Sequence, residues 1–168
     1  PKFGEDMIGS QNTISGSVAT IKHYIGEMYF LRAYEYFKKL QLFGDFPIIN
    51  QPLADEMEAL REASKRFPRN EVARFIISDL DKAYAYMSDV DMATTRINKD
   101  AAMLVKSRVA LFEATWLQNF KGTAFVPGGE GWPGASLHNN YQYPSGNIDN
   151  EVKYFLEQAV EASQLVAD

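Results

Sequence analysis

The sequence predicts an all-α protein. In four segments, apolar residues recur at spacings of three and four, which places them on one face of a helix. Glycine and proline residues punctuate these segments and supply helix stop and start signals. The predicted main helices span about residues 17–43, 68–88, 99–119 and 149–167, and we treat residues 1–168 as one helical domain.

The first predicted helix begins near Ser17, after a loop over residues 1–16 that is rich in small and polar residues. Gly26 lies inside this helix and costs it about 1 kcal/mol relative to alanine, so we expect a neighbouring helix to approach closely there. Gly44 ends the helix, because glycine readily takes the left-handed conformation that follows a helix terminus. The apolar stripe of this helix consists of Phe30, Ala33, Tyr34, Phe37 and Leu40.

Arg32 lies among these apolar neighbours. A buried guanidinium without a partner costs several kcal/mol, so Arg32 needs a hydrogen-bonding partner. We expect this partner to be Asp45 or the backbone carbonyls at the helix end near Gly44.

Three further main helices follow a connection of mixed structure. Residues 46–52 are predicted to be extended, because a residue before proline is displaced from the helical region, and residues 55–63 to form a short helix with solvated charges. Pro68 suits the first turn of the second main helix, and Asn98 offers an N-cap oxygen to the third. The three stripes consist of Val72, Ile76, Leu80, Ala83 and Met87, then of Ala102, Val105, Val109, Phe112 and Trp116, and finally of Val152, Leu156, Ala159, Ser163 and Val166.

The composition excludes several classes of function. The chain carries 17 basic and 22 acidic residues without a block of Lys or Arg, so we expect no nucleic-acid partner. It has no cysteine, which excludes disulfides, thiolate nucleophiles and Cys-ligated zinc. His23 and Glu27 share a helix face, but two ligands do not make a metal site, and we expect neither a metal nor another cofactor.

Three motifs follow one another along the chain. The first runs from Glu27 to Pro47 and fits E-x-x-F-L-R-A-x-x-Y-F followed by F-G-D-x-P. The second begins at Arg66 and fits R-x-[SP]-x-x-E-V-x-x-F-I-x-x-D-L-x-x-A. The third begins at Arg96 and is similar to R-[IV]-[TN]-K-x-A-A with a later K-x-R-x-x-L-Y, where Phe112 replaces the tyrosine. Together they resemble the signature of the SusD/RagB-like outer-membrane nutrient-binding family.

This resemblance implies a helical protein on the cell surface of Bacteroidetes, beside a TonB-dependent, SusC-like transporter. It implies the binding of a glycan or another small nutrient and its delivery to that transporter at the outer membrane. It also implies tetratricopeptide-like antiparallel helix pairs, and Ala33 and Phe37 fit the A-x-x-x-F element of such repeats without a strict 34-residue period. Family members are longer lipoproteins, so we interpret this chain as an N-terminal portion that lacks the lipid anchor.

Residues 121–150 carry the candidate ligand contacts. This long stretch is rich in glycine and proline, and structureless connections of such length are usually functional or disordered. Trp132, Tyr141 and Tyr143 are the best candidates for glycan contact, because their flat apolar faces and polar tips suit the mixed surface of a sugar, and Asn139 offers hydrogen bonds. Alternatively, these aromatic residues pin the loop onto the helices or contact the transporter.

Two other functions stay open. The same helices suit a tetratricopeptide-type module that binds peptides in a concave groove without binding carbohydrate. Paired carboxylates could serve glycoside hydrolysis, but their separation is invisible in a sequence. The chain lacks a G-x-S-x-G elbow and has only two histidines, so we expect a binding protein without catalytic residues.

Overall fold

The computed structural model describes Pro1 and residues 17–88 and 95–167, so most of the loop predicted for residues 1–16 lies outside the described residues. The described part of the chain forms five α-helices and no strand, which confirms the all-α prediction. The main helices are α2 (Val18–Phe43), α4 (Arg69–Tyr86), α5 (Lys99–Asn119) and α6 (Ile148–Ala167), with the short helices α3 (Met57–Ala63) and η1 (Pro133–Ser136) in the connections.

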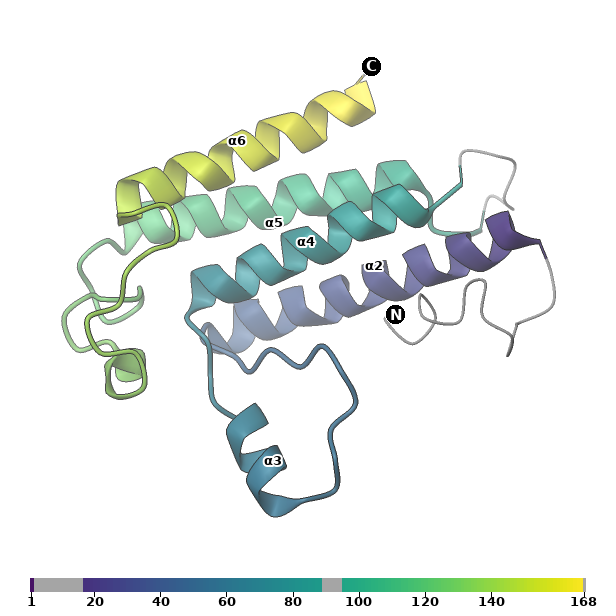
Figure 1. Cartoon of the computed structure of the whole chain (residues 1–168). Helices are drawn as coiled ribbons and strands as arrows, with labels where there is room; N and C mark the ends of the chain where they lie inside the picture. Colours follow the sequence, from purple (N-terminus) through teal and green to yellow (C-terminus); the bar gives the residue numbers. More distant parts are fainter. Residues whose placement is uncertain (2–16, 89–94, 168) are drawn as a thin grey trace.

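Successive main helices run in opposite directions (Figure 1). Helix α4 packs against both α2 and α5, and α6 packs against α5. The connection that contains α3 and the connection that contains η1 both leave the same end of the bundle, on the left in Figure 1. Residues far apart in the sequence therefore meet at this end.

The buried face of α4 is the one that the sequence predicts, and all five residues of its stripe are buried. The stripe of α2 is only partly right. Tyr29 is fully buried, whereas Tyr34 is 41% exposed. Helix α2 packs mainly against α4, on the side that carries Tyr29 and Ala33, so Tyr34 lies too far around the helix to reach the core.

The stripes of α5 and α6 are also displaced. Val105, Phe112 and Trp116 are only half-buried, because α5 is covered by α4 on one side and by α6 on another, and its small residues fill these contacts. On α6 the buried residues are Glu151, Phe155, Ala159 and Ala162, so Leu156 and Ser163 face solvent. Of the predicted α6 stripe, only Ala159 is buried.

Gly26 confirms the expected close approach of a neighbouring helix. A Cβ atom at this position would lie 2.8 Å from Cγ of Met87 and 3.0 Å from the carbonyl oxygen of Ala83. The C-terminal turn of α4 therefore crosses α2 at a point where only glycine leaves enough room.

The partner predicted for Arg32 is wrong. Its guanidinium donates two hydrogen bonds to the buried Asp79 carboxylate of α4, from Nε to Oδ2 at 2.6 Å and from Nη2 to Oδ1 at 2.7 Å. Gly44 lies twelve positions after Arg32, so at about 1.5 Å per residue the helix end is about 18 Å away. An arginine side chain is too short to span that distance, and the partner comes from the helix alongside.

Candidate functional site

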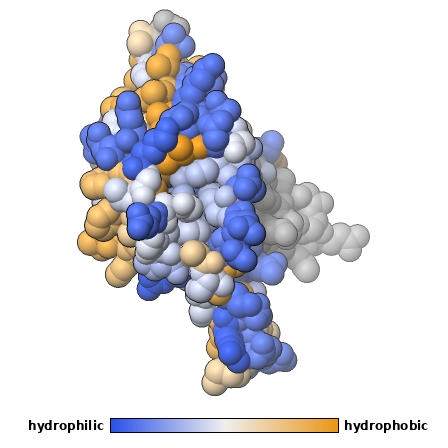
Figure 2. Space-filling view, turned by 90° about the vertical axis from the view of Figure 1, so that its left-hand side faces the viewer, coloured by the Kyte–Doolittle hydropathy of each residue, from blue (hydrophilic) through white to orange (hydrophobic). Residues whose placement is uncertain are grey.

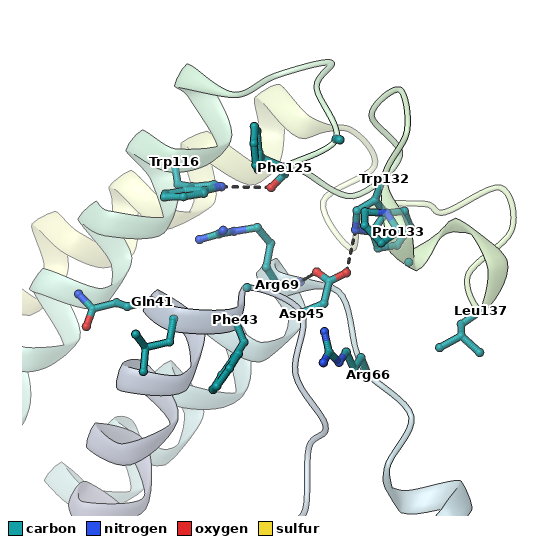
Figure 3. Close-up of a pocket in the computed structure, with 14 residues that line it drawn as sticks. Gln41, Phe43, Asp45, Arg66, Arg69, Trp116, Phe125, Trp132, Pro133 and Leu137 are labelled. Carbon is teal, nitrogen blue, oxygen red and sulfur yellow. Dashed lines mark hydrogen bonds between the residues drawn. The ribbon is translucent and has the colours of Figure 1, made fainter.

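A pocket of about 490 Å³ lies at the end of the bundle where α2 ends and α4 begins (Figure 3). Its walls come from the last turn of α2, the start of α4, the last turns of α5 and the connection between α5 and α6. The pocket is lined by Gln41, Leu42, Phe43, Gly44, Asp45, Arg66, Arg69, Trp116, Ala124, Phe125, Trp132, Pro133, Gly134 and Leu137.

The sequence brings the two ends of the α2 to α4 connection together. Gly44 adopts a φ of 67° and donates its N–H to the Leu40 carbonyl at 2.9 Å, which closes α2. After the segment that contains α3, the chain returns to this point, and Phe67 pairs with Phe46 through two backbone hydrogen bonds, of 3.0 and 3.2 Å. This pairing places Asp45 beside Arg69, although 24 residues separate them.

A buried ion pair lies behind the pocket floor. The Arg69 guanidinium donates to the Glu113 carboxylate of α5, with Nη2 to Oε2 at 2.8 Å and Nε to Oε1 at 3.0 Å, and both side chains are almost fully buried. The guanidinium also lies 4.1 Å from the centre of the Trp116 ring. Burial raises the pKa of Glu113, and the charge and hydrogen bonds of Arg69 act against this rise. The positive charge of Arg69 is thus compensated from within the protein.

Asp45 joins three segments at the pocket wall. Its Oδ1 accepts the backbone N–H of Arg69 at 2.9 Å, and its Oδ2 accepts the indole N–H of Trp132 at 2.8 Å (Figure 3). Burial raises the pKa of Asp45, and the hydrogen bonds from Trp132 and Arg69 lower it only in part. This carboxylate therefore holds together the end of α2, the start of α4 and the connection that carries Trp132.

The predicted ligand contacts are brought partly together. Trp132 lines the pocket, but it is only 5% exposed and its ring packs beside Tyr141, with 5.6 Å between the ring centres. Tyr141 lies within hydrogen-bonding distance of the Asn70 side chain, at 2.9 and 3.0 Å, and the Tyr143 hydroxyl donates to the Pro127 carbonyl at 2.7 Å.

The Tyr141 contact ties the connection to α4, as one alternative interpretation of the aromatic residues expects, whereas the Tyr143 contact lies within the connection. Neither Tyr141 nor Tyr143 is among the residues that line the pocket, and the exposed Asn139 is not among them either. Ligand contact by these residues stays a prediction.

Two aromatic residues that sequence reasoning did not select line the pocket with exposed rings. Phe43, in the last turn of α2, is 54% exposed, and Phe125, in the connection after α5, is 62% exposed. The Phe125 carbonyl accepts the indole N–H of Trp116 at 3.1 Å, which fixes the backbone beside this ring. The available signal was an aromatic residue next to a helix-ending glycine and another inside a Gly-rich stretch, but exposure is not readable from a sequence.

Exposed apolar residues are unevenly distributed at this end of the molecule. Figure 2 faces the end that lies on the left in Figure 1, and apolar residues gather on the left-hand side of that view, whereas hydrophilic residues dominate its right-hand side. Isolated exposed apolar side chains are normal on protein surfaces, but rings that surround a pocket suit a ligand with apolar faces. Phe43 and Phe125 are rings of this kind.

The pocket suits binding rather than bond cleavage. Among its lining residues, Asp45 is the single carboxylate, whereas glycoside hydrolysis ordinarily uses two facing carboxyl groups. Within the described residues, no three His, Asp or Glu side chains gather as a metal site, and His23 Nε2 lies 3.6 Å from the Glu27 carboxylate. None of the helices in the described part of the chain combines the length and the hydropathy of a membrane span.

A helical scaffold with such a pocket is suited to non-covalent ligand binding. The chain belongs to the SusD-like family, because residues 8–111, more than half of its length, match the family profile described as starch-binding and associating with the outer membrane. Members are binding proteins rather than enzymes, which confirms the expected non-enzymatic role.

The chain is also similar to SusD-like protein P2 from Formosa agariphila, with 27% identity over 119 residues. This match covers 71% of the present chain but only 23% of that relative, so the chain spans about a quarter of the relative's length. No solved structure matches the chain.

Proposed function

We propose that this protein binds a glycan, or another small nutrient with similar faces, in the pocket at the bundle end. The observation that carries the proposal is a pocket flanked by the exposed rings of Phe43 and Phe125 in a member of a starch-binding family. Its volume of about 490 Å³ lies within the range of about 300–1,000 Å³ that is usual for small-ligand sites. The mechanism is non-covalent binding on a largely preformed scaffold.

The chemistry of the pocket favours an uncharged glycan segment. Aromatic rings pack against the C–H faces of a sugar, and the exposed Gln41 amide can both donate and accept hydrogen bonds. Charges at the pocket balance, since Glu113 compensates Arg69 and the Asp45 carboxylate opposes the exposed Arg66. A uronate or sulfate group would therefore find little net positive charge there.

Delivery to a TonB-dependent, SusC-like transporter at the outer membrane completes the proposed function. Family membership supports this partner and this location. In this proposal a lipid anchor, which the family resemblance implies, holds the protein at the membrane. Trp132 supports the pocket wall in this proposal, whereas Tyr141, Tyr143 and Asn139 act at its margin.

Isothermal titration calorimetry with uncharged malto-oligosaccharides, other neutral oligosaccharides and an oligogalacturonate tests the proposal. We expect binding of a neutral oligosaccharide and little dependence on salt. Phe125→Ala and Phe43→Ala should each lose about fivefold to tenfold in affinity, since stacked aromatic contacts contribute on the order of 1 kcal/mol. Tyr24→Ala is the matched control, because Tyr24 is an exposed aromatic residue near the opposite end of α2. Equal losses in all three variants, or no binding of any glycan, would contradict the proposal.

The alternative peptide-binding function has its own location. Leu104, Arg108 and Leu111 line a groove of about 510 Å³ along the exposed face of α5. If peptides bind in this groove and no glycan binds the protein, the function is that of a tetratricopeptide-type peptide-binding module rather than of a glycan receptor. Substitution of Leu111 by Ala should then weaken peptide binding, and Phe125→Ala should not.

A further inference from the structure

The structure assigns Asp45 a positioning role: it holds the Trp132 wall of the pocket against the ends of α2 and α4, and so fixes the shape that a ligand meets. This inference rests on the proposed function, because it concerns the same pocket. Asp45 belongs to the F-G-D-x-P motif, but this motif assigns it no role in binding. The positioning role follows from where its two carboxylate oxygens lie.

Each carboxylate oxygen of Asp45 accepts from a different segment. Oδ1 accepts the Arg69 backbone N–H at 2.9 Å, which secures the first turn of α4, and Oδ2 accepts the Trp132 indole N–H at 2.8 Å. Hydrogen bonds to an ionised acceptor are stronger than neutral ones. Trp132 lies 87 residues after Asp45, so this bond is a long-range tie across the pocket.

The Asp45 bond joins the Trp132 ring itself to the end of α2, and close packing surrounds the ring. Gly134 lies against the ring so closely that a Cβ atom there would come within 2.2 Å of Cζ2 of Trp132. On the same connection, His138 stacks with the indole at 6.0 Å between ring centres, and its Nε2 lies 2.8 Å from the Arg66 carbonyl. His138 thus links the connection to the segment before α4, whereas Asp45 accepts the hydrogen bond that the indole itself donates.

The rest of the connection has its own anchors. Tyr141 bonds to Asn70 of α4, and Ser145 accepts from Arg74 of α4 at 2.7 Å. None of these residues lines the pocket. Loss of the Asp45 bond should therefore displace the Trp132 wall while the connection stays attached, and affinity and stability become separable.

Three variants test this role: Asp45→Ala, Trp132→Phe, which keeps an aromatic ring but removes the N–H donor, and the control Asn98→Ala, which removes the N-cap of α5 at the opposite end of the bundle. For Asp45→Ala we expect about a fivefold to tenfold loss of affinity for the neutral oligosaccharide that binds the wild type, because the Trp132 wall loses its hydrogen bond to the end of α2. Asn98→Ala should lower the melting temperature about as much as Asp45→Ala does but leave affinity within about twofold.

The double variant decides whether Asp45 acts through Trp132. If it does, Asp45→Ala combined with Trp132→Phe should lose no more affinity than the worse single variant, because both remove the same bond. The chain has two tryptophans, so the indole N–H resonances report the wall directly, and that of Trp132 should shift in Asp45→Ala while that of Trp116 stays in place.

Two outcomes overturn the inference in different ways. Additive losses in the double variant, or an unshifted Trp132 resonance with unchanged affinity in Asp45→Ala, would overturn the positioning role and leave glycan binding standing. A wild-type protein that binds no glycan would overturn the proposed function, and with it the purpose assigned to Asp45.

Discussion

Breaking the buried ion pair between Arg69 and Glu113 should destabilise the fold strongly. Glu113→Gln keeps the shape of the side chain but leaves the buried guanidinium of Arg69 without a carboxylate, and both partners are almost completely buried. Removal of one member of a buried pair costs about 3–5 kcal/mol, a large share of the typical 5–15 kcal/mol stability of a domain. The cost reflects an uncompensated charge more than a lost attraction.

The double variant Arg69→Met with Glu113→Gln separates these two contributions. Because it removes the stranded charge, it should cost less than the sum of the single variants by up to about 3 kcal/mol. Urea denaturation followed by circular dichroism measures all three free energies of unfolding.

The exposed pair of Lys38 and Glu35 provides the control, and Glu35→Gln should leave stability within experimental error. A Glu113→Gln protein as stable as the wild type would refute the reasoning. The same holds if the loss of unfolding free energy in the double variant equals the sum of the two single losses.

Three further predictions concern the helix contacts. Gly26→Ala should cost about 1–3 kcal/mol in spite of the better helix propensity of alanine, because the added Cβ meets the backbone of α4. Asp79→Asn should cost about 1.5–3 kcal/mol, because it weakens both hydrogen bonds from Arg32. Wild-type stability of either variant in urea would contradict these contacts. Burial alone would raise the pKa of Glu151, but hydrogen bonds led by Arg74 lower it. The ionised Glu151 should thus stabilise the fold above about pH 4.3, and this stabilisation should vanish as the pH falls through the folded-state pKa. Glu151→Gln should therefore destabilise the protein only at the higher pH, and a destabilisation independent of pH in urea titrations would contradict this prediction.

The sequence predicts the helices well and their buried faces unevenly. Every residue of the stripe predicted for α4 is buried. Helix α4 packs against both α2 and α5, so its periodic apolar face is covered along its whole length. Helix α5 is covered on two sides, so small residues such as Ala110 and Ala114 take buried positions that a single stripe of large residues does not reveal. On α6 the buried face includes the charged Glu151. A search for periodic apolar residues does not find a buried carboxylate.

Polar residues in the interior were the least predictable feature. Arg69 and Glu113 are 44 residues apart, and Asn70 and Glu151 are 81 residues apart, so neither pairing has a local signature. The same limit applies to the pocket. Its walls come from four separate segments. The motif residues among them are Phe43, Gly44, Asp45 and Arg66, and the motifs do not show that these residues line one pocket. The resemblance identified the family, whereas the exposed rings emerged only from the fold.

The most direct test of this account is a map of NMR chemical-shift changes when a neutral oligosaccharide is added to the protein. We predict that the changes gather at the backbone amides of Phe43, Gly44 and Phe125 and at the indole N–H of Trp132, with none along the exposed face of α5 around Leu111. Changes confined to the α5 face, or no change with any glycan at millimolar concentration, would contradict the assignment of glycan binding to the bundle end.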